Sequence, residues 1–179
     1  MEIILIILIV LIAVIVTGFG VLSHLKKVER GKYYMAAANI IREDFLNFSL
    51  QNPVNNDGSI NMPSEQRTML YIKSKTSGKK AQFVFDPAKR ILIGRDKFNS
   101  NIYINEAFVS QHHCSIFSEN NLVFLQDMNS ANGTYVKRGF LKKYHLLNGQ
   151  HIQLRSNDTI IIGSNKFRII LFFYDMALM

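Results

Sequence analysis

The sequence is poor in residues that form disulfides or catalytic centres. Its 179 residues include no tryptophan and one cysteine, Cys114, so an intrachain disulfide is excluded. A single cysteine fits a reducing compartment. Because Cys114 opens an apolar, strand-like run, and free cysteine usually packs as a small hydrophobic side chain, we expect it to be buried rather than reactive.

Motifs of the common enzyme classes are also missing. The chain has no Walker-type loop, no Gly-x-Ser-x-Gly elbow, no His-Glu-x-x-His and no persuasive pair of carboxylates. Its five histidines show no ligand spacing with cysteine or carboxylate, which argues against zinc. We therefore expect a protein that is not an enzyme and that uses no metal or cofactor.

Negative charge is scarce in the second part of the chain. Residues 1–66 hold five Lys and Arg against six Asp and Glu, whereas residues 67–179 hold sixteen against seven. The net charges are −1 and +9, so the cationic excess belongs to the C-terminal part. Such a charge attracts phosphopeptides, acidic proteins, nucleic acid or anionic lipids without choosing among them.

The N-terminus carries a run of twenty residues without a charge, from Ile3 to Leu22. Twenty helical residues span roughly 30 Å, the thickness of a bilayer's hydrocarbon core. A cleavable signal peptide is the rival interpretation, but its basic residues precede the apolar run. Here Lys26, Lys27, Arg30 and Lys32 follow it. We predict an uncleaved membrane helix over residues 1–24, with the N-terminus outside and the remainder cytoplasmic.

Residues 25–50 continue a helical pattern and predict an amphipathic juxtamembrane connector. Apolar residues recur at helical spacing, and Ala36–Ala38 adds helix propensity. This apolar stripe could pack on the protein's own domain, on the bilayer or on a second copy of the chain. Residues 51–66 are rich in Asn, Pro, Gly and Ser and predict a linker.

From residue 67 the apolar period shortens to that of strands. Short runs such as Ala81–Phe85, Arg90–Ile93 and Thr159–Ile162 are separated by turn signals such as Asn148-Gly149. Many short strands spaced by about 8–12 residues indicate an all-β sandwich or barrel. We assign this β-rich domain to residues 67–175.

Three motifs in this domain resemble those of the forkhead-associated (FHA) family. They are Gly94-Arg95, Ser110-x-x-His113 and Asn132-Gly133-Thr134, in that order. The segment from Ser156 to Ile169 also resembles the family's closing strands. The resemblance implies a β-sandwich whose loops at one end bind a phosphothreonine peptide.

The resemblance also implies a role for each motif residue. Arg95 and Ser110 would bind the phosphate, because guanidinium and hydroxyl groups donate to its oxygens. Asn132 would bind the peptide backbone beside the phosphothreonine. Support of the site falls to Gly94, His113, Gly133 and Thr134. Two positions of the site depart from the family's usual residues: Ala131 stands where threonine is common, and Gln111 where arginine or asparagine is.

These observations predict a membrane-anchored module that binds phosphothreonine proteins made by a serine/threonine kinase. Residues 3–22 would supply the membrane contact, and no nucleic-acid partner is expected because no recognised module interleaves aromatic with basic residues. The alternative is a structural membrane protein whose β-domain binds partners without phosphate. The sequence leaves the partner, the kinase, the residues preferred beside the phosphothreonine and the oligomeric state open.

Overall fold

The computed structural model describes residues 2–51, 66–76 and 79–175. Most of the expected linker at 51–66 therefore lies outside the described residues, between the end of a helix at Gln51 and the start of a strand at Gln66. Two compact units are present, Met1–Ala36 and Ala37–Met179.

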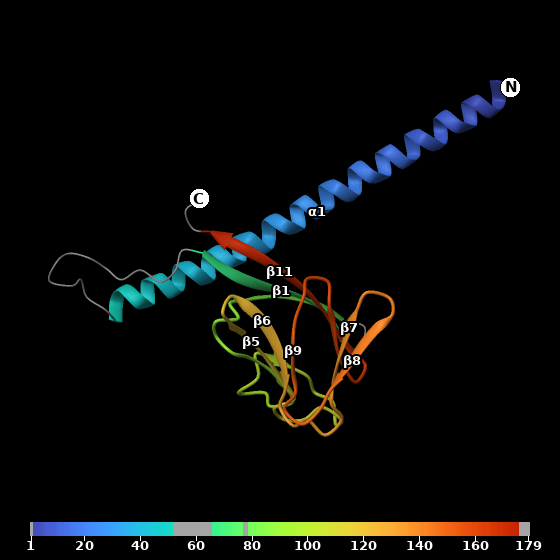
Figure 1. The fold of residues 1–179 in the computed structure, drawn as a ribbon. Coiled ribbons are helices and arrows are strands. Elements are labelled where there is room, and N and C mark those ends of the chain that lie inside the picture. The colour runs from blue at the N-terminus through green and yellow to red at the C-terminus, as the bar shows by residue number, and fades with distance from the viewer. Residues whose placement is uncertain (1, 52–65, 77–78, 176–179) are drawn as a thin grey trace. The chain divides into compact units, whose positions relative to one another are not determined.

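The expected membrane helix and the expected connector form one continuous helix, α1, from Glu2 to Gln51 (Figure 1). Residues 3–22 are exposed throughout, and α1 is long and apolar enough to be a candidate membrane span. Thr17, the polar interruption in this run, donates its hydroxyl to the carbonyl oxygens of Ala13 and Val14, at 2.9 and 3.0 Å. A hydroxyl satisfied within its own helix suits an apolar environment.

The second unit contains two mostly antiparallel sheets that form a sandwich. The six-stranded sheet has the order β2-β1-β11-β10-β7-β8, and the five-stranded sheet has the order β4-β3-β5-β6-β9. The strands are β1 (Gln66–Thr76), β2 (Lys79–Phe85), β3 (Ile91–Gly94), β4 (Ile102–Tyr103), β5 (Cys114–Glu119), β6 (Leu122–Asp127), β7 (Thr134–Arg138), β8 (Lys142–Leu146), β9 (His151–Gln153), β10 (Thr159–Ile162) and β11 (Asn165–Asp175). The only parallel pair among the described strands is β3 with β4.

Alternating side chains from both sheets build the core. Leu70, Ile160 and Phe167 of the six-stranded sheet are fully buried with Ile116 and Leu125 of the other. Each such side chain contributes about 1.5–3 kcal/mol when removed from water. The expected burial of Cys114 is confirmed, and burial raises the pKa of its thiol because the thiolate would be desolvated.

A second apolar cluster covers the opposite face of β1 and β11. Met69 pairs with Phe172 across these strands, and both are buried although neither belongs to the main core. Their neighbours Leu70 and Leu171 pack in the core, so these two side chains point the other way. On α1, Ala37, Ala38 and Ile41 are buried in the same compact unit. The end of α1 therefore packs as part of the β-domain, whereas Leu25, Val28 and Met35 of the connector are exposed in the other unit.

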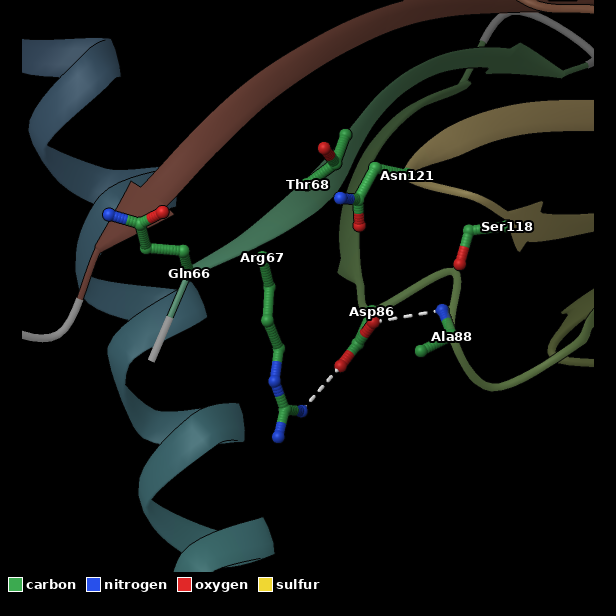
Figure 2. A pocket seen from close by; sticks show the side chains of 7 residues that line it. All are labelled: Gln66, Arg67, Thr68, Asp86, Ala88, Ser118 and Asn121. Carbon is green, nitrogen blue, oxygen red and sulfur yellow. Dashed lines mark hydrogen bonds and ion pairs between the residues drawn. The ribbon is translucent and has the colours of Figure 1, made fainter. Parts of the chain in front are cut away.

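Ion pairs between α1 and the β-domain lie beside this cluster. Asp44 of α1 accepts from Arg67 of β1 at 3.4 Å and forms an ion pair with Lys89. Figure 2 shows Arg67 pointing to Asp86, whose carboxylate lies 2.8 Å from the guanidinium and also accepts from the backbone N–H of Ala88. A hollow of about 210 Å³ adjoins them, but its opposite charges satisfy each other, so we interpret it as structural.

The sequence analysis missed one strand. Lys142 and Lys143 open β8, which pairs with β7 as a hairpin, and the sequence pattern does not mark this segment as a strand. The signal was weak because β8 is short and begins with two lysines. Lysine is depleted in strands, and here pairing with β7 overrides that preference.

Candidate functional site

The three motifs meet where strands of both sheets end. Gly94 and Arg95 lie at the end of β3, and Ser110–His113 leads into β5, the antiparallel partner of β3. Asn132 and Gly133 lead into β7 of the other sheet. Antiparallel pairing sets the end of β3 beside the start of β5, while loops joined to β7 must be held by other contacts.

Gly94 is needed for close approach rather than for a turn. A Cβ atom at this position would overlap the carbonyl oxygen of Gln111 and lie 3.1 Å from the backbone nitrogen of His113. Its φ is not in the left-handed region, whereas Gly133 has a φ of 70°. The absence of a side chain therefore lets β3 and the loop before β5 touch backbone to backbone.

Arg95 is held through its backbone while its side chain is exposed. Its N–H donates to the carbonyl oxygen of Ser110 at 2.9 Å. Among the described residues, the Arg95 guanidinium makes no hydrogen bond or ion pair, including none to the side chains of Ser110 and Asn132. All five of its N–H donors are therefore available to an anion.

The neighbouring carboxylate, Asp96, is engaged elsewhere. It accepts the side-chain amide of Asn99 at 2.6 Å and the backbone N–H of Phe98 at 2.9 Å. These bonds, the Asn99 bond above all, lower the pKa of Asp96 because they favour its charged form. The Nε2 of His112 lies 3.6 Å from the Asp96 carboxylate. Asp96 thus caps its own loop and does not neutralise Arg95.

His113 joins the loops of the two sheets. Its ring is buried, its Nδ1 accepts the backbone N–H of Ser110 at 3.2 Å, and its Nε2 lies 3.2 Å from the carbonyl oxygen of Gly133. An accepting Nδ1 must be unprotonated, so Nε2 carries the proton and donates to Gly133. A neutral imidazole therefore sets the spacing between the Ser110 and Asn132 loops.

Ser110, Ala131 and Asn132 approach one another at the surface. The Ser110 hydroxyl oxygen accepts the backbone N–H of Ala131 at 3.1 Å, and this leaves the hydroxyl proton to donate outward. Asn132 donates one amide N–H to the carbonyl oxygen of Phe108 at 2.8 Å, which leaves its oxygen and second N–H for a ligand. Gln111 is also exposed here.

A buried carboxylate supports the Asn132 loop, and the sequence analysis missed it. Asp127, at the end of β6, accepts the N–H of Ser130 at 3.0 Å and its hydroxyl at 2.6 Å. It also accepts the hydroxyl of Thr134 at 2.8 Å. The spacing Asp-x-x-Ser was the available signal, since aspartate often bonds backbone N–H groups a few residues ahead in a turn.

The state of His113 leads to a pH prediction. Burial lowers the pKa of His113, because desolvation disfavours the imidazolium. Below about pH 6.5 the unfolded chain then binds a proton that the native chain does not, so stability is expected to fall as the pH drops from there towards the lowered native pKa. Urea unfolding of the full chain at several pH values measures this slope. His113→Gln should flatten it, whereas His151→Gln at an exposed position should not; an unchanged slope in His113→Gln would contradict the assignment.

No candidate metal centre accompanies these loops in the part of the chain that is described. Within residues 2–51, 66–76 and 79–175, no group of three His, Cys, Asp or Glu side chains is placed to hold a metal ion. The chemistry that the loops present is hydrogen-bond donation by Arg95, Ser110 and Asn132 towards a ligand from outside.

Comparisons with known proteins agree with this fold. Residues 91–163 match the family model of the FHA domain. The FHA domain of an Arabidopsis thaliana hypothetical protein is 21% identical, with a TM-score of 0.51 over 65% of this chain and 94% of that one. Mycobacterium tuberculosis EmbR, solved with a low-affinity phosphopeptide, is 22% identical, with a TM-score of 0.46 over 68% of this chain but only 27% of EmbR. Comparison with curated proteins found no match.

The two stacked sheets and the ordered loops define an FHA-type β-sandwich. Residues 91–163 of this sandwich match the FHA domain, and the sandwich follows a long apolar helix that is a candidate membrane anchor.

Proposed function

We propose that this chain is a membrane-anchored, non-catalytic module that binds phosphothreonine peptides. Arg95 and Ser110 bind the phosphate, Asn132 binds the peptide backbone, and Gln111 and Ala131 line the same surface. The binding domain comprises residues 67–175, behind a membrane helix at 1–24, a connector at 25–50 and a linker at 51–66.

The observation that carries the proposal is the set of unused donors on linked loops. Arg95 keeps its guanidinium exposed while its backbone is bonded to Ser110, and Ser110 is bonded in turn to Ala131 beside Asn132. A phosphothreonine carries about −1.5 to −2 charge and three acceptor oxygens at neutral pH. Donors already fixed at loop ends lose little conformational entropy when they bind such a group.

The support around the site fits the same purpose. Four residues support the site and do not bind the ligand. Each of them is engaged in joining one loop to the next: Gly94, His113, Gly133 and Thr134. Ala131 supplies only its backbone N–H to Ser110, so the polar contact that a threonine side chain would add is absent. We infer that phosphate recognition persists and that the preference for residues beside the phosphothreonine differs.

The anchor sets where binding takes place. We infer that residues 3–22 span a membrane with the N-terminus outside, because the cationic residues 26, 27, 30 and 32 follow the span. The FHA domain is then cytoplasmic, where a serine/threonine kinase supplies phosphothreonine. Tethering raises the local concentration of a weakly binding partner at the membrane.

A peptide experiment tests the function directly. The full chain, held in neutral lipid nanodiscs, is exposed to a library of peptides in phosphothreonine, phosphoserine and unphosphorylated forms. We expect binding of a subset of phosphothreonine peptides, and loss of that binding after phosphatase treatment. Binding that is indifferent to phosphatase would instead favour a phosphate-independent structural role.

A further inference from the structure

The outer face of the six-stranded sheet carries an unusual arrangement of charge. Along β1, Leu70 and Ile72 point into the core, so Lys73 and Lys75 alternate to the outer face. Residues paired directly across antiparallel strands project to the same side. The register of each strand pair therefore shows which other side chains share this face.

Two rows of cations cross the sheet on this side. In one row Lys73 pairs with Arg168, Arg168 with Thr159, Thr159 with Lys137, and Lys137 with Lys143. In the next row Lys80 pairs with Lys75, Lys75 with Lys166, and Lys166 with Ile161. We call these seven cations the cationic face: Lys73, Lys75, Lys80, Lys137, Lys143, Lys166 and Arg168.

Carboxylates do not balance this charge within the sheet. Its strands carry three Lys and Arg on β1 and two each on β2, β7, β8 and β11, against one carboxylate, Asp175. Asp175 lies at the far end of β11, where it accepts from Gln66. Arg168 is bonded to a neutral oxygen, that of Asn157 at 2.9 Å. The strands of this sheet therefore carry a net positive charge.

Like charges placed directly opposite one another are destabilising in a sheet. Here Lys73 faces Arg168, Lys75 faces Lys166 and Lys137 faces Lys143. Folding brings Lys75 beside Lys166 and Lys137 beside Lys143, so an anionic partner on this face relieves the repulsion between them. Exposed positive charge arranged in a plane suits an extended anionic surface.

An apolar tip stands at the edge of the same face. The turn between β7 and β8, in the orange hairpin of Figure 1, carries Phe140 and Leu141, which are 97% and 96% exposed. They line a hollow of about 450 Å³ together with cations of the face and their neighbours: Lys137, Lys142, Lys143, Thr159, Ile161 and Lys166. Proteins that bind at the membrane interface combine exposed apolar side chains with lysines in the same way.

We propose that the cationic face and the Phe140–Leu141 tip dock on an anionic lipid bilayer. The lysines lie over acidic head groups, and the two apolar side chains enter the boundary between head groups and acyl chains. The candidate membrane span on the same chain favours this docking, because it tethers the domain and so raises its effective concentration at the bilayer.

Nucleic acid fits this face less well. Binding of single strands relies on exposed aromatic rings that stack on bases. The ring of Tyr135 is already stacked on His145 with 4.0 Å between centroids, and the Nζ of Lys143 lies 4.0 Å from its centre. Phe140 is an exposed ring, but its neighbour Leu141 is aliphatic and offers no plane for stacking. One ring beside an aliphatic side chain favours lipid over a run of stacked bases.

This surface is separate from the phosphothreonine site. Gly133 precedes β7 and Gly139 follows it, so the proposed site and the tip stand at opposite ends of a five-residue strand. At roughly 3.3 Å per residue the strand separates them by about 16 Å. A domain docked through the tip can therefore keep its peptide loops open, and the proposal holds whether or not those loops bind phosphothreonine.

The test places a single fluorescent label on the tip. Cys114 is fully buried, so Leu141→Cys introduces the one accessible thiol among the described residues. The full chain, labelled there with an environment-sensitive dye, is reconstituted in nanodiscs of phosphatidylcholine alone or of an equal mixture with phosphatidylglycerol. We expect a blue shift, and quenching by spin-labelled lipid, only with phosphatidylglycerol. Both effects should weaken in 1 M salt, where the Debye length falls to about 3 Å.

Matched variants separate docking from general charge. Lys143→Glu with Lys166→Glu should abolish the blue shift, whereas Arg155→Glu with Lys97→Glu, exposed cations off this face, should retain it at equal net charge. A label at Glu119→Cys, on the other sheet, should stay unshifted. The proposal is overturned if the tip label behaves alike in both nanodiscs, if both charge variants respond equally, or if only added nucleic acid or an acidic peptide shifts it.

Discussion

Replacement of Arg95 by alanine is expected to weaken binding of a phosphothreonine peptide by at least about 100-fold. The side chain would donate two or more charge-assisted hydrogen bonds, each contributing roughly 1.5–3 kcal/mol, and about 3 kcal/mol in total corresponds to a factor above 100. The affinity of Arg95→Lys for the peptide should lie between those of the wild type and Arg95→Ala, because an ammonium keeps the charge but loses the planar fork. Fluorescence anisotropy of the best library peptide with the full chain measures the dissociation constants.

The control for this prediction is its neighbour Lys97, which is also exposed on the same loop. Lys97→Ala removes the same unit of charge without the guanidinium and should change the dissociation constant only a few-fold. Because the Arg95 side chain is exposed, the thermal unfolding midpoint of Arg95→Ala should stay close to that of the wild type. Equal losses in both variants would show that the loop acts through general charge and not through Arg95.

Replacement of Asp127 by alanine is expected to destabilise the β-domain by roughly 3 kcal/mol or more. The carboxylate accepts three hydrogen bonds, and the groups of Ser130 and Thr134 that donate them are buried. An unsatisfied buried donor costs about 1–3 kcal/mol. Since these bonds fix the segment that holds Asn132, phosphopeptide binding should fall as well, even at temperatures where the variant is folded.

Urea unfolding of the full chain, followed by tyrosine fluorescence, measures the change in the free energy of unfolding. Asp127→Asn keeps the shape but replaces one accepting oxygen by a donor, so it should be destabilising to a smaller extent. Glu119→Ala, at an exposed carboxylate on β5, should stay within about 0.5 kcal/mol of the wild type. An Asp127→Ala chain that unfolds like the wild type would refute the supporting role assigned to this carboxylate.

Much of the sandwich could be predicted because its strands are short and alternating. The runs at 91–93 and 159–162 were located within a residue of their bounds in the structure, since turn residues such as Asn157 and Gly163 flank them. β8 was missed, because two lysines at its start hide a strand whose stability comes from pairing with β7. The match of family motifs gave the fold more surely than periodicity did, which left a sandwich and a barrel open.

The candidate site was less fully predictable. The sequence pointed to Arg95, Ser110 and Asn132 through motif order, but it did not show that Asp96, the neighbour of Arg95, caps its own loop. The sequence also did not show that Gly94 is needed for backbone contact with Gln111. Asp127 went unnoticed, because a lone aspartate acquires meaning only when Ser130 and Thr134 are brought around it.

The sequence by itself determined the apolar N-terminal run, the excess of positive charge after residue 66 and the strand-and-turn rhythm of the β-domain. These are properties of local composition and spacing, which a chain carries before it folds. Tertiary structure alone decided which loops are joined by His113, which face of α1 is buried against the β-domain, and that lysines distant in sequence share one face of a sheet. Such relations depend on strand order and register, because pairing brings together residues that the sequence keeps apart.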